Sequence, residues 1–326
     1  MTLKKILKIA GIVLLVLLGI ILVLGLIPVS APDLPASPDP VADYDEAIQR
    51  FETAVAAEEG ILMSPKSASV LMTHGEKTEK VYVLIHGWTN SPFQWVDFGQ
   101  MLFDKGHNVL IMRIPYHGLT SRNVGELRHA TPEVMREYAD QVVDIAAGLG
   151  EEVDVVGLSV GGAIASWIAQ NRSDVTHVMS IAPMYGIGRL PRFVDYFLLN
   201  FASRAPNFNP TSPSEPQREH VYRGQSSKGV ANAMLFGKTL LAQAAAEKKA
   251  ASHIIVVTND NDTTVNNQLT DDLTAMWRTT GSEPVTYVFP KEDGYPHNII
   301  DRTSNPDADV VYAKLLELLG EALPSE

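Results

Sequence analysis

Residues 153–162 read VDVVGLSVGG, a short β-branched run that ends in Gly-x-Ser-x-Gly. The next residues, 163–169, read AIASWIA and predict a buried helix. A strand that turns sharply into a helix holds Ser159 on a strained corner, where glycines two positions to either side avoid collisions. We therefore expect the Ser159 hydroxyl to face a ligand, with the Val160 N–H beside it to receive negative charge. Because short motifs also occur by chance, the alternative is a glycine-rich turn in which Ser159 only caps the helix.

The composition of the chain limits its class. With 326 residues and 45% hydrophobic composition, it can form one large domain or one domain with an insertion. The net charge of −12 and the lack of a Lys/Arg cluster argue against a nucleic-acid surface. Because the chain has no cysteine, disulfides, thiolate metal sites and cysteine nucleophiles are excluded.

The N-terminal segment predicts a membrane anchor. Residues 9–27 form an uncharged run of nineteen after Lys4, Lys5 and Lys8, close to the ~20 residues that cross a bilayer as a helix. A cleaved signal peptide is the alternative, but its apolar region normally has about 7–15 residues. Basic residues precede the run and acidic residues follow it, so we expect a single-pass helix with a cytoplasmic N-terminus and the catalytic body outside. Signal cleavage would instead give a secreted protein.

Three segments follow from this pattern. Residues 1–27 form the anchor, residues 28–42 a proline-rich linker that holds the body off the bilayer, and residues 43–326 the body. Residues 43–59 have the spacing of an amphipathic helix. Roughly seventy residues separate the strands that end near Pro183 and begin near His253, more than a crossover requires. We expect a cap insertion at about 184–251, whose apolar residues 193–201 either form its core or line an acyl channel.

Short apolar runs alternate with helical patterns through the body. Residues 67–73 and 81–86 are expected to pair as strands around the charged turn 74–80. Further strands are predicted at 108–114, 153–158, 175–181, 253–258 and 285–289, and helices at 93–105, 131–147 and 309–319. This alternation predicts an α/β fold with a mostly parallel, doubly wound sheet and a site at the carboxyl ends of its strands.

Loops at these strand ends carry reactive groups. The loop His86-Gly87-Trp88 has no large side chain at its bend, so the Trp88 N–H can point at a substrate oxygen. His86 lacks a second ligand at a spacing suited to a metal ion.

Two later loops supply the partners that a serine nucleophile needs, a base and an acid that orients it. Residues 259–265 contain Asp260 and Asp262, and residues 291–297 end in His297. The chain order Ser, Asp, His is the one expected after this type of turn. The alternatives are solvated loop acids with a capping histidine, or a Ca²⁺ loop, which lacks the required glycine and glutamate.

The chain resembles the α/β-hydrolase superfamily over about residues 64–323, and most closely its monoacylglycerol lipase and carboxylesterase branch. The resemblance rests on His86-Gly87-Trp88, Arg113 to Gly118, Gly157 to Gly161, Asp262 followed by Val265, and His297. It implies an α/β-hydrolase fold with a catalytic triad of Ser159, Asp262 and His297, and an oxyanion hole of the Trp88 and Val160 N–H groups. Two departures, Tyr116 and Asn259 where glycines are usual, remove no catalytic group but can reshape the pocket.

These residues predict hydrolysis of a carboxylic ester through an acyl-enzyme, with neither a metal ion nor an organic cofactor. The tethered body and apolar cap favour a lipid-like ester or an acyl glycerol as the substrate. The same triad also serves an acyltransferase, a thioesterase or an amidase, because the fold does not fix the acceptor. A catalytically silent, membrane-anchored binding module is the rival of a different class, and it predicts a damaged triad.

Overall fold

A seven-stranded sheet forms the centre of the computed structural model, which describes residues 2–211, 218–246 and 253–321. Its strands are β1 (Val70–Met72), β2 (Thr78–Ile85), β3 (Asn108–Ile111), β4 (Gly150–Leu158), β5 (His177–Ile181), β6 (His253–Asn259) and β7 (Val285–Phe289). The order across the sheet is β1-β3-β2-β4-β5-β6-β7, and each neighbouring pair is parallel except β1 with β3. The mostly parallel α/β sheet predicted from the sequence is confirmed.

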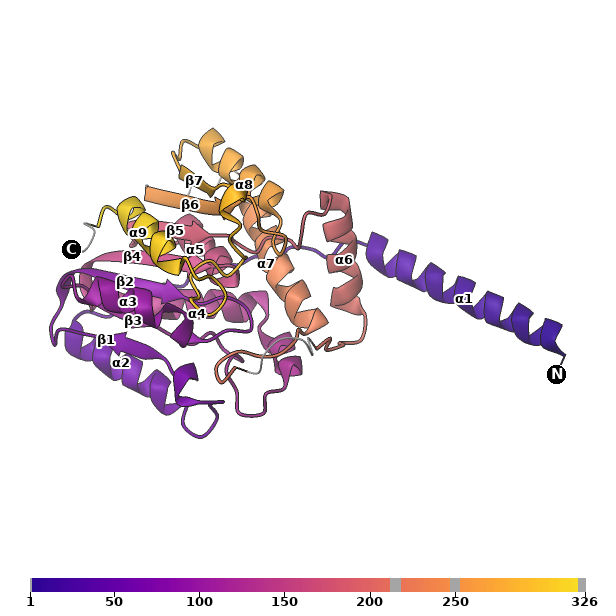
Figure 1. The fold of residues 1–326 in the computed structure, drawn as a ribbon, viewed down its shortest axis with the longest axis horizontal. Coiled ribbons are helices and arrows are strands. Elements are labelled where there is room, and N and C mark those ends of the chain that lie inside the picture. Colours follow the sequence, from indigo (N-terminus) through magenta and orange to yellow (C-terminus); the bar gives the residue numbers. More distant parts are fainter. Residues whose placement is uncertain (1, 212–217, 247–252, 322–326) are drawn as a thin grey trace.

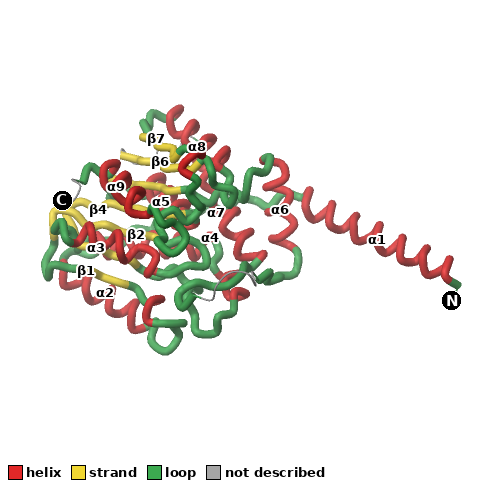
Figure 2. Tube along the Cα trace, in the orientation of Figure 1, coloured by secondary structure: helices red, strands yellow, loops and turns green. Residues whose placement is uncertain are grey.

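Helices cover both faces of the sheet (Figure 1). The α-helices in the described residues are α1 (Leu3–Leu26), α2 (Tyr44–Ala56), α3 (Val96–Phe103), α4 (Pro132–Ala146), α5 (Val160–Asn171), α6 (Arg192–Arg204), α7 (Ser227–Ala245), α8 (Asn267–Thr279) and α9 (Ala308–Leu318). The rings of Phe98 on α3 and Tyr312 on α9 lie 5.4 Å apart, so these helices share one face. On the other face α4, α5, α7 and α8 pack together. Figure 2 shows the strands in yellow among these red helices.

One edge of the sheet differs from the prediction. The expected hairpin between residues 67–73 and 81–86 is wrong, because β1 pairs antiparallel with β3 and β2 lies between β3 and β4. β2 ends in five buried residues, Val81–Ile85, which suit a central strand covered on both faces. The three half-buried residues of β1 suit an edge. A charged turn predicts that the chain reverses, but not which strand takes the neighbouring place.

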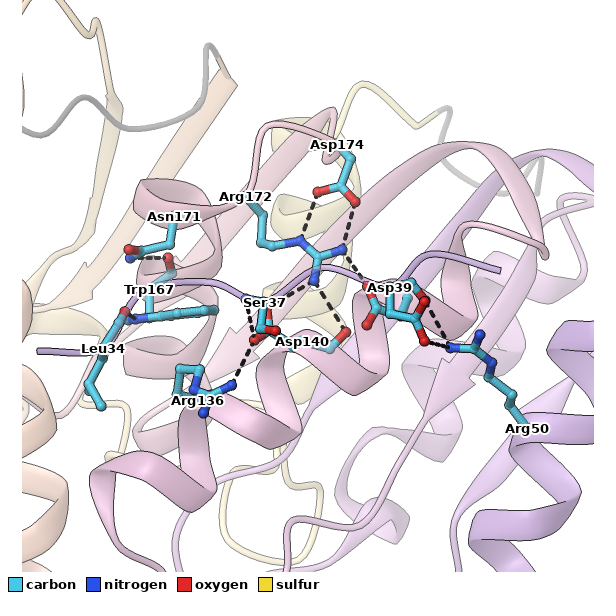
Figure 3. A network of polar contacts seen from close by, with 11 residues as sticks. Leu34, Ser37, Asp39, Arg50, Arg136, Asp140, Trp167, Asn171, Arg172 and Asp174 are labelled. Atoms are coloured by element: carbon cyan, nitrogen blue, oxygen red, sulfur yellow. Dashed lines mark hydrogen bonds and ion pairs between the residues drawn. The ribbon is translucent and has the colours of Figure 1, made fainter. Parts of the chain in front are cut away.

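The proline-rich segment 28–42, predicted as a linker, has residues that lie against the body. Leu34 is 1% exposed, and its C=O accepts a hydrogen bond from the Trp167 indole N–H at 3.2 Å. The Ser37 N–H donates to the Asp140 carboxylate of α4 at 3.0 Å. Figure 3 shows both contacts along the same stretch of chain. An extended segment leaves its backbone groups free to bond to neighbouring helices, which is how this one is fixed.

A buried arginine holds the carboxylate to which this segment bonds. The Arg172 side chain is 0% exposed and donates to Asp140 at 2.9 Å, Asp144 at 2.6 Å and Asp174 at 2.6 Å. Figure 3 shows this guanidinium between α4 and the end of α5. Burial is costly for an unpaired charge, and these three carboxylates pair with the buried guanidinium beneath the segment.

The segment between β5 and β6 carries α6 and α7 (Figure 1). Of the insertion predicted at 184–251, residues 212–217 and 247–251 lie outside the described residues, as do residues 322–326 of the predicted body. Among the described residues, α1 is the helix that is long and apolar enough to cross a membrane. It points away from the rest of the molecule and contacts α6 at its inner end (Figure 1).

Candidate active site

The site is built on the turn between β4 and α5. Ser159 has φ 61° and ψ −116°, a strained conformation for a residue with a side chain. A Cβ at Gly157 would overlap the backbone of Gly161, and a Cβ at Gly161 would overlap the Ile85 carbonyl. Glycine is therefore required at both positions for α5 to approach the ends of β4 and β2. The Ser159 side chain makes no capping hydrogen bond to α5, so the capping interpretation is wrong.

Ser159 lines a cavity of about 520 Å³ at the carboxyl edge of the sheet. Part of the wall comes from the β5–β6 segment, through the apolar side chains of Met184, Ile187, Val221 and Val230. Residues 193–201, all described, do not line this cavity. Of the two alternatives for these residues, the structure favours packing over an acyl channel, because α6 packs on α1 and α7.

His297 lies in the same cavity and is bonded to Asp262. The distance from His297 Nδ1 to Asp262 Oδ2 is 2.6 Å, and Asp262 is 1% exposed. The other carboxylate oxygen of Asp262 accepts the Thr264 N–H at 2.7 Å. Asp260 is exposed, and its backbone C=O accepts a hydrogen bond from Arg189. Of the two acidic residues in this loop, it is Asp262 that bonds to the histidine.

The cavity brings the serine and histidine together without a hydrogen bond between them. Within the described part of the chain, the Ser159 hydroxyl has no hydrogen-bond partner, although both residues line the same space. Loose spacing of a nucleophile and its base is usual in a site without substrate, and it tightens on binding.

Two backbone N–H groups flank Ser159. Val160 is the first residue of α5, and the first four N–H groups of a helix have no partner within it. Gly87 lies so near the turn that a Cβ on it would be 3.4 Å from Ser159 Cβ, which brings the following Trp88 to the cavity. In the part of the chain that the structure describes, the Trp88 N–H bonds to no other group. Both N–H groups are available to an oxyanion.

A buried histidine fixes the loop that carries Trp88. The His86 Nε2 accepts the Ile114 N–H at 3.0 Å, and its Nδ1–H donates to the Gly87 C=O at 2.9 Å. Burial lowers the pKa of His86 well below its usual value, so the ring stays neutral. With both nitrogens engaged, His86 has a structural role.

A bridge of amide side chains, which has no sequence motif, joins this loop to the histidine loop. Gln94 Oε1 accepts the Gly87 N–H at 2.7 Å, and Gln94 Nε2 donates to Asn298 Oδ1 at 2.7 Å. The Asn298 amide continues to Asp301 at 3.0 Å, and Arg218 of the β5–β6 segment donates to the same carboxylate oxygen at 2.8 Å. The bridge therefore couples the Trp88 loop, the residue after His297 and the cavity wall.

The two departures from the expected family pattern have structural partners. Asn259 donates to the carbonyls of Tyr295 and Pro296 at 3.0 and 3.1 Å, which fixes the loop just before His297. Tyr116 has φ 67°, a region that favours glycine, and its C=O accepts a hydrogen bond from the Tyr222 hydroxyl at 3.0 Å. Tyr222 comes from the β5–β6 segment, so that segment stabilises the unusual turn.

Acyl transfer at a serine requires a hydroxyl, an imidazole oriented by a carboxylate and N–H groups beside the hydroxyl, and this cavity contains groups of each kind. Across residues 2–211, 218–246 and 253–321, no three His, Asp or Glu side chains gather into a group that could hold a metal ion.

Comparison with known proteins gives related folds. A thermostable monoacylglycerol lipase of Bacillus sp. (strain H-257) is 25% identical over 129 residues, which cover 35% of this chain and 48% of the relative. The chain thus matches about half of the length of that relative. The crystal structure of Paleococcus ferrophilus monoacylglycerol lipase has a TM-score of 0.60 at 16% identity, covering 78% of this chain and 98% of the other. A soluble variant of monoglyceride lipase from Saccharomyces cerevisiae, in complex with a substrate analog, has a TM-score of 0.59 at 15% identity, with 77% and 91% covered.

The family assignment rests on the match to a family model. The model of the alpha/beta hydrolase family matches residues 82–311, more than half of the chain. This match confirms the family resemblance read from the sequence motifs. The chain belongs to the alpha/beta hydrolase family.

Proposed function

We propose that the chain is a serine hydrolase that cleaves carboxylic esters through an acyl-enzyme. Ser159 attacks the carbonyl, His297 takes and returns the proton, Asp262 orients the imidazole, and the Trp88 and Val160 N–H groups bind the oxyanion. The observation that carries the proposal is the 2.6 Å bond between buried Asp262 and His297, in a cavity that contains the strained Ser159 turn.

The substrate we propose is a lipid-like ester or an acyl glycerol. The apolar side chains of Met184, Ile187, Val221 and Val230 suit an acyl chain, and the polar side chains of Asn90 and Gln225 in the same cavity suit an alcohol group. The similar proteins named above that are lipases of monoacylglycerols support this choice.

Labelling with a fluorophosphonate, followed by hydrolysis of p-nitrophenyl esters of increasing acyl length, tests the proposal. Ser159→Ala should abolish labelling and lower kcat by at least about 10⁴-fold, because the nucleophile is lost while the fold stays intact. Ser121→Ala, at an exposed serine, is the matched control and should change neither.

The rivals give different results in the same assay. Labelling that persists in Ser159→Ala would move the nucleophile elsewhere, and no labelling of the wild-type protein would favour a binding module. Faster cleavage of a matched thioester or amide would indicate a thioesterase or amidase. Acyl transfer to added glycerol in preference to water would indicate an acyltransferase.

We further propose that α1 is a retained, single-pass anchor with a cytoplasmic N-terminus and the body on the other side of the membrane. Most side chains of α1 are exposed and apolar, which suits lipid. The residues just after it are bonded to the body: the Val29 N–H donates to Asn200, and Leu34 is buried. Cleavage near residue 31 would remove the first of these contacts, which favours retention over a signal peptide.

Fractionation of cells that express the full chain tests the anchor. We expect the protein to sediment with membranes, and protease added outside to remove the body. A soluble mature protein that begins near residue 32 would show a cleaved signal instead.

A further inference from the structure

The inner end of α1 is packed on the helix α6. Gly25 is buried there, and a Cβ on Gly25 would overlap the ring of Phe197. Small residues let two helices approach closely, so this glycine permits the contact. Figure 1 shows α6 crossing the end of α1, between α1 and the rest of the molecule.

Three polar side chains, called the clamp here, bind backbone groups in the last turn of α1 and in the residues just after it: Asn200, Arg204 and Lys238. The Asn200 amide bonds to the Gly25 C=O and to the Val29 N–H, each at 2.9 Å. Arg204 donates to the carbonyls of Leu24 (3.5 Å), Ile27 (2.7 Å) and Pro28 (2.9 Å). Lys238 donates to the Val29 carbonyl. Cations suit the negative C-terminal end of a helix, so the clamp is the C-terminal cap of α1.

The length of the apolar run places the clamp at a membrane surface. As a helix, residues 9–27 span roughly 28 Å, close to the ~30 Å hydrocarbon core of a bilayer. Gly25 and Ile27 then lie where α1 leaves the hydrocarbon, and α6, which is bonded to both, lies at the same depth. This step rests on the proposed anchor.

One face of α6 is directed toward this layer. Phe193, Phe197, Asn200 and Arg204 recur at helical spacing and therefore share one side of the helix. Phe197, Asn200 and Arg204 contact the end of α1, whereas Phe193, one turn earlier, is 75% exposed. Burying such a side chain in an apolar layer is favourable.

We propose that α6 is an interfacial helix that binds the surface of the bilayer spanned by α1, with Phe193 inserted among the lipids. The clamp fixes α6 to the anchor, and the bonds of segment 28–42 to α4 and α5 fix the anchor to the body. The catalytic body therefore has one orientation on the membrane, in place of the free motion that a flexible tether would allow.

The absence of cysteine from the chain permits a direct test. Phe193→Cys and Val310→Cys are labelled with a polarity-sensitive fluorophore and reconstituted into phosphatidylcholine vesicles that contain a lipid spin-labelled near the headgroup. Val310 is the control because it is 59% exposed and lies on α9, at the far side of the body from α1 (Figure 1). We expect several-fold stronger quenching at position 193, and equal quenching at the two positions would overturn the proposal.

A second comparison tests the clamp itself. Asn200→Ala with Arg204→Ala, in the Phe193→Cys protein, should lower the quenching, whereas Arg192→Ala should not, because Arg192 pairs with Asp272 and lies outside the clamp. An unchanged signal in the clamp variant would refute fixation of α6 by these contacts. Thermal midpoints show whether each variant is folded. If the protein does not float with the vesicles, the proposed anchor is wrong and so is this inference. If it floats but shows no quenching at position 193, only the proposed interfacial position of α6 is wrong.

Discussion

Two carboxylates that are close in sequence, Asp260 and Asp262, have different surroundings and so different expected roles. Asp262→Asn should lower kcat for ester hydrolysis by about 10³–10⁴-fold, because an amide neither holds His297 in the accepting tautomer nor stabilises the imidazolium. The 2.6 Å contact of Asp262 with His297 is the reason to expect this loss. Asp260→Asn is the matched control, and it should cost roughly tenfold or less because Asp260 is exposed. If Asp260→Asn lowers kcat far more than Asp262→Asn does, Asp260 is the acid. If neither substitution lowers kcat by more than about tenfold, another group orients the histidine.

Gln94 acts through its neighbours, so its removal should affect turnover more than binding. Gln94→Leu leaves the Gly87 N–H and the Asn298 amide without their 2.7 Å partner. Displacement of the Trp88 N–H from the oxyanion position should lower kcat by about 10–100-fold with little change in KM. Steady-state kinetics of one p-nitrophenyl ester measures both constants.

Two further variants isolate the bridge. Gln94→Glu keeps an acceptor for the Gly87 N–H and should recover part of kcat, and Gln100→Leu, at an exposed glutamine on α3, should have no effect. A Gln94→Leu protein with wild-type kcat would show that the Trp88 loop holds its position without the bridge.

The residues that could be predicted from the sequence are those that a motif identifies. Ser159 is recognisable because its conformation demands flanking glycines, and His297 because it follows a strand that ends at the same edge. Asp260 and Asp262 both follow such a strand, and only the family resemblance, through Val265, distinguishes Asp262. Gln94 and Asn298 are not recognisable, because their role depends on a contact between segments 204 residues apart in the chain. An amide side chain in a loop beside an oxyanion donor is a weak signal that only the fold makes specific.

At the scale of elements, a substitution within segment 28–42 tests whether this segment packs stably on the body or acts as a spacer. Leu34→Ala should lower the stability of the body by about 2–4 kcal/mol, because it empties a buried leucine site. This loss should appear as a decrease of several degrees in the thermal midpoint of the detergent-solubilised protein.

The control for this substitution lies one residue away. Asp33 is exposed, and Asp33→Ala should change stability by no more than about 0.5 kcal/mol. Equal midpoints for Leu34→Ala and the wild-type protein would indicate that the segment is detached in solution, as a flexible linker would be.

The type of each element could be predicted from the sequence, whereas the strands and helices beside which it packs could not. Period and composition identify β1 and the proline-rich segment as extended, but an extended chain can pair or pack in several places. β1 joins β3 because the buried β2 needs parallel neighbours on both sides. Residues 28–42 bond to α4 and α5 because the Asp140 carboxylate, held by Arg172, and the Trp167 indole supply partners. Such partners come from distant parts of the sequence and have no local signature.

For the molecule as a whole, two buried imidazoles under the Trp88 loop make stability depend on pH. Burial lowers the pKa of His117 to about 4, with a further decrease from the nearby Arg113 guanidinium, and His86 is lowered in the same direction. The unfolded chain takes up these protons near pH 6.5, whereas the folded chain does not. The contribution of the neutral rings is therefore complete above about pH 6.5 and decreases as the pH falls toward about 4.

The size of this effect follows from the shift at His117. Between about pH 6.5 and pH 4, the free energy of unfolding should fall by about 3 kcal/mol through this residue alone. Carboxylates titrate in the same range, so the informative quantity is the difference between the wild-type protein and His117→Gln, measured by urea unfolding at several pH values. His117→Gln is less stable at neutral pH, since it loses the bond to the Pro115 C=O, but this difference should shrink as the solution becomes more acidic. Parallel pH curves for the two proteins would mean that His117 is protonated in the folded state and that the packing beneath the Trp88 loop admits the charge.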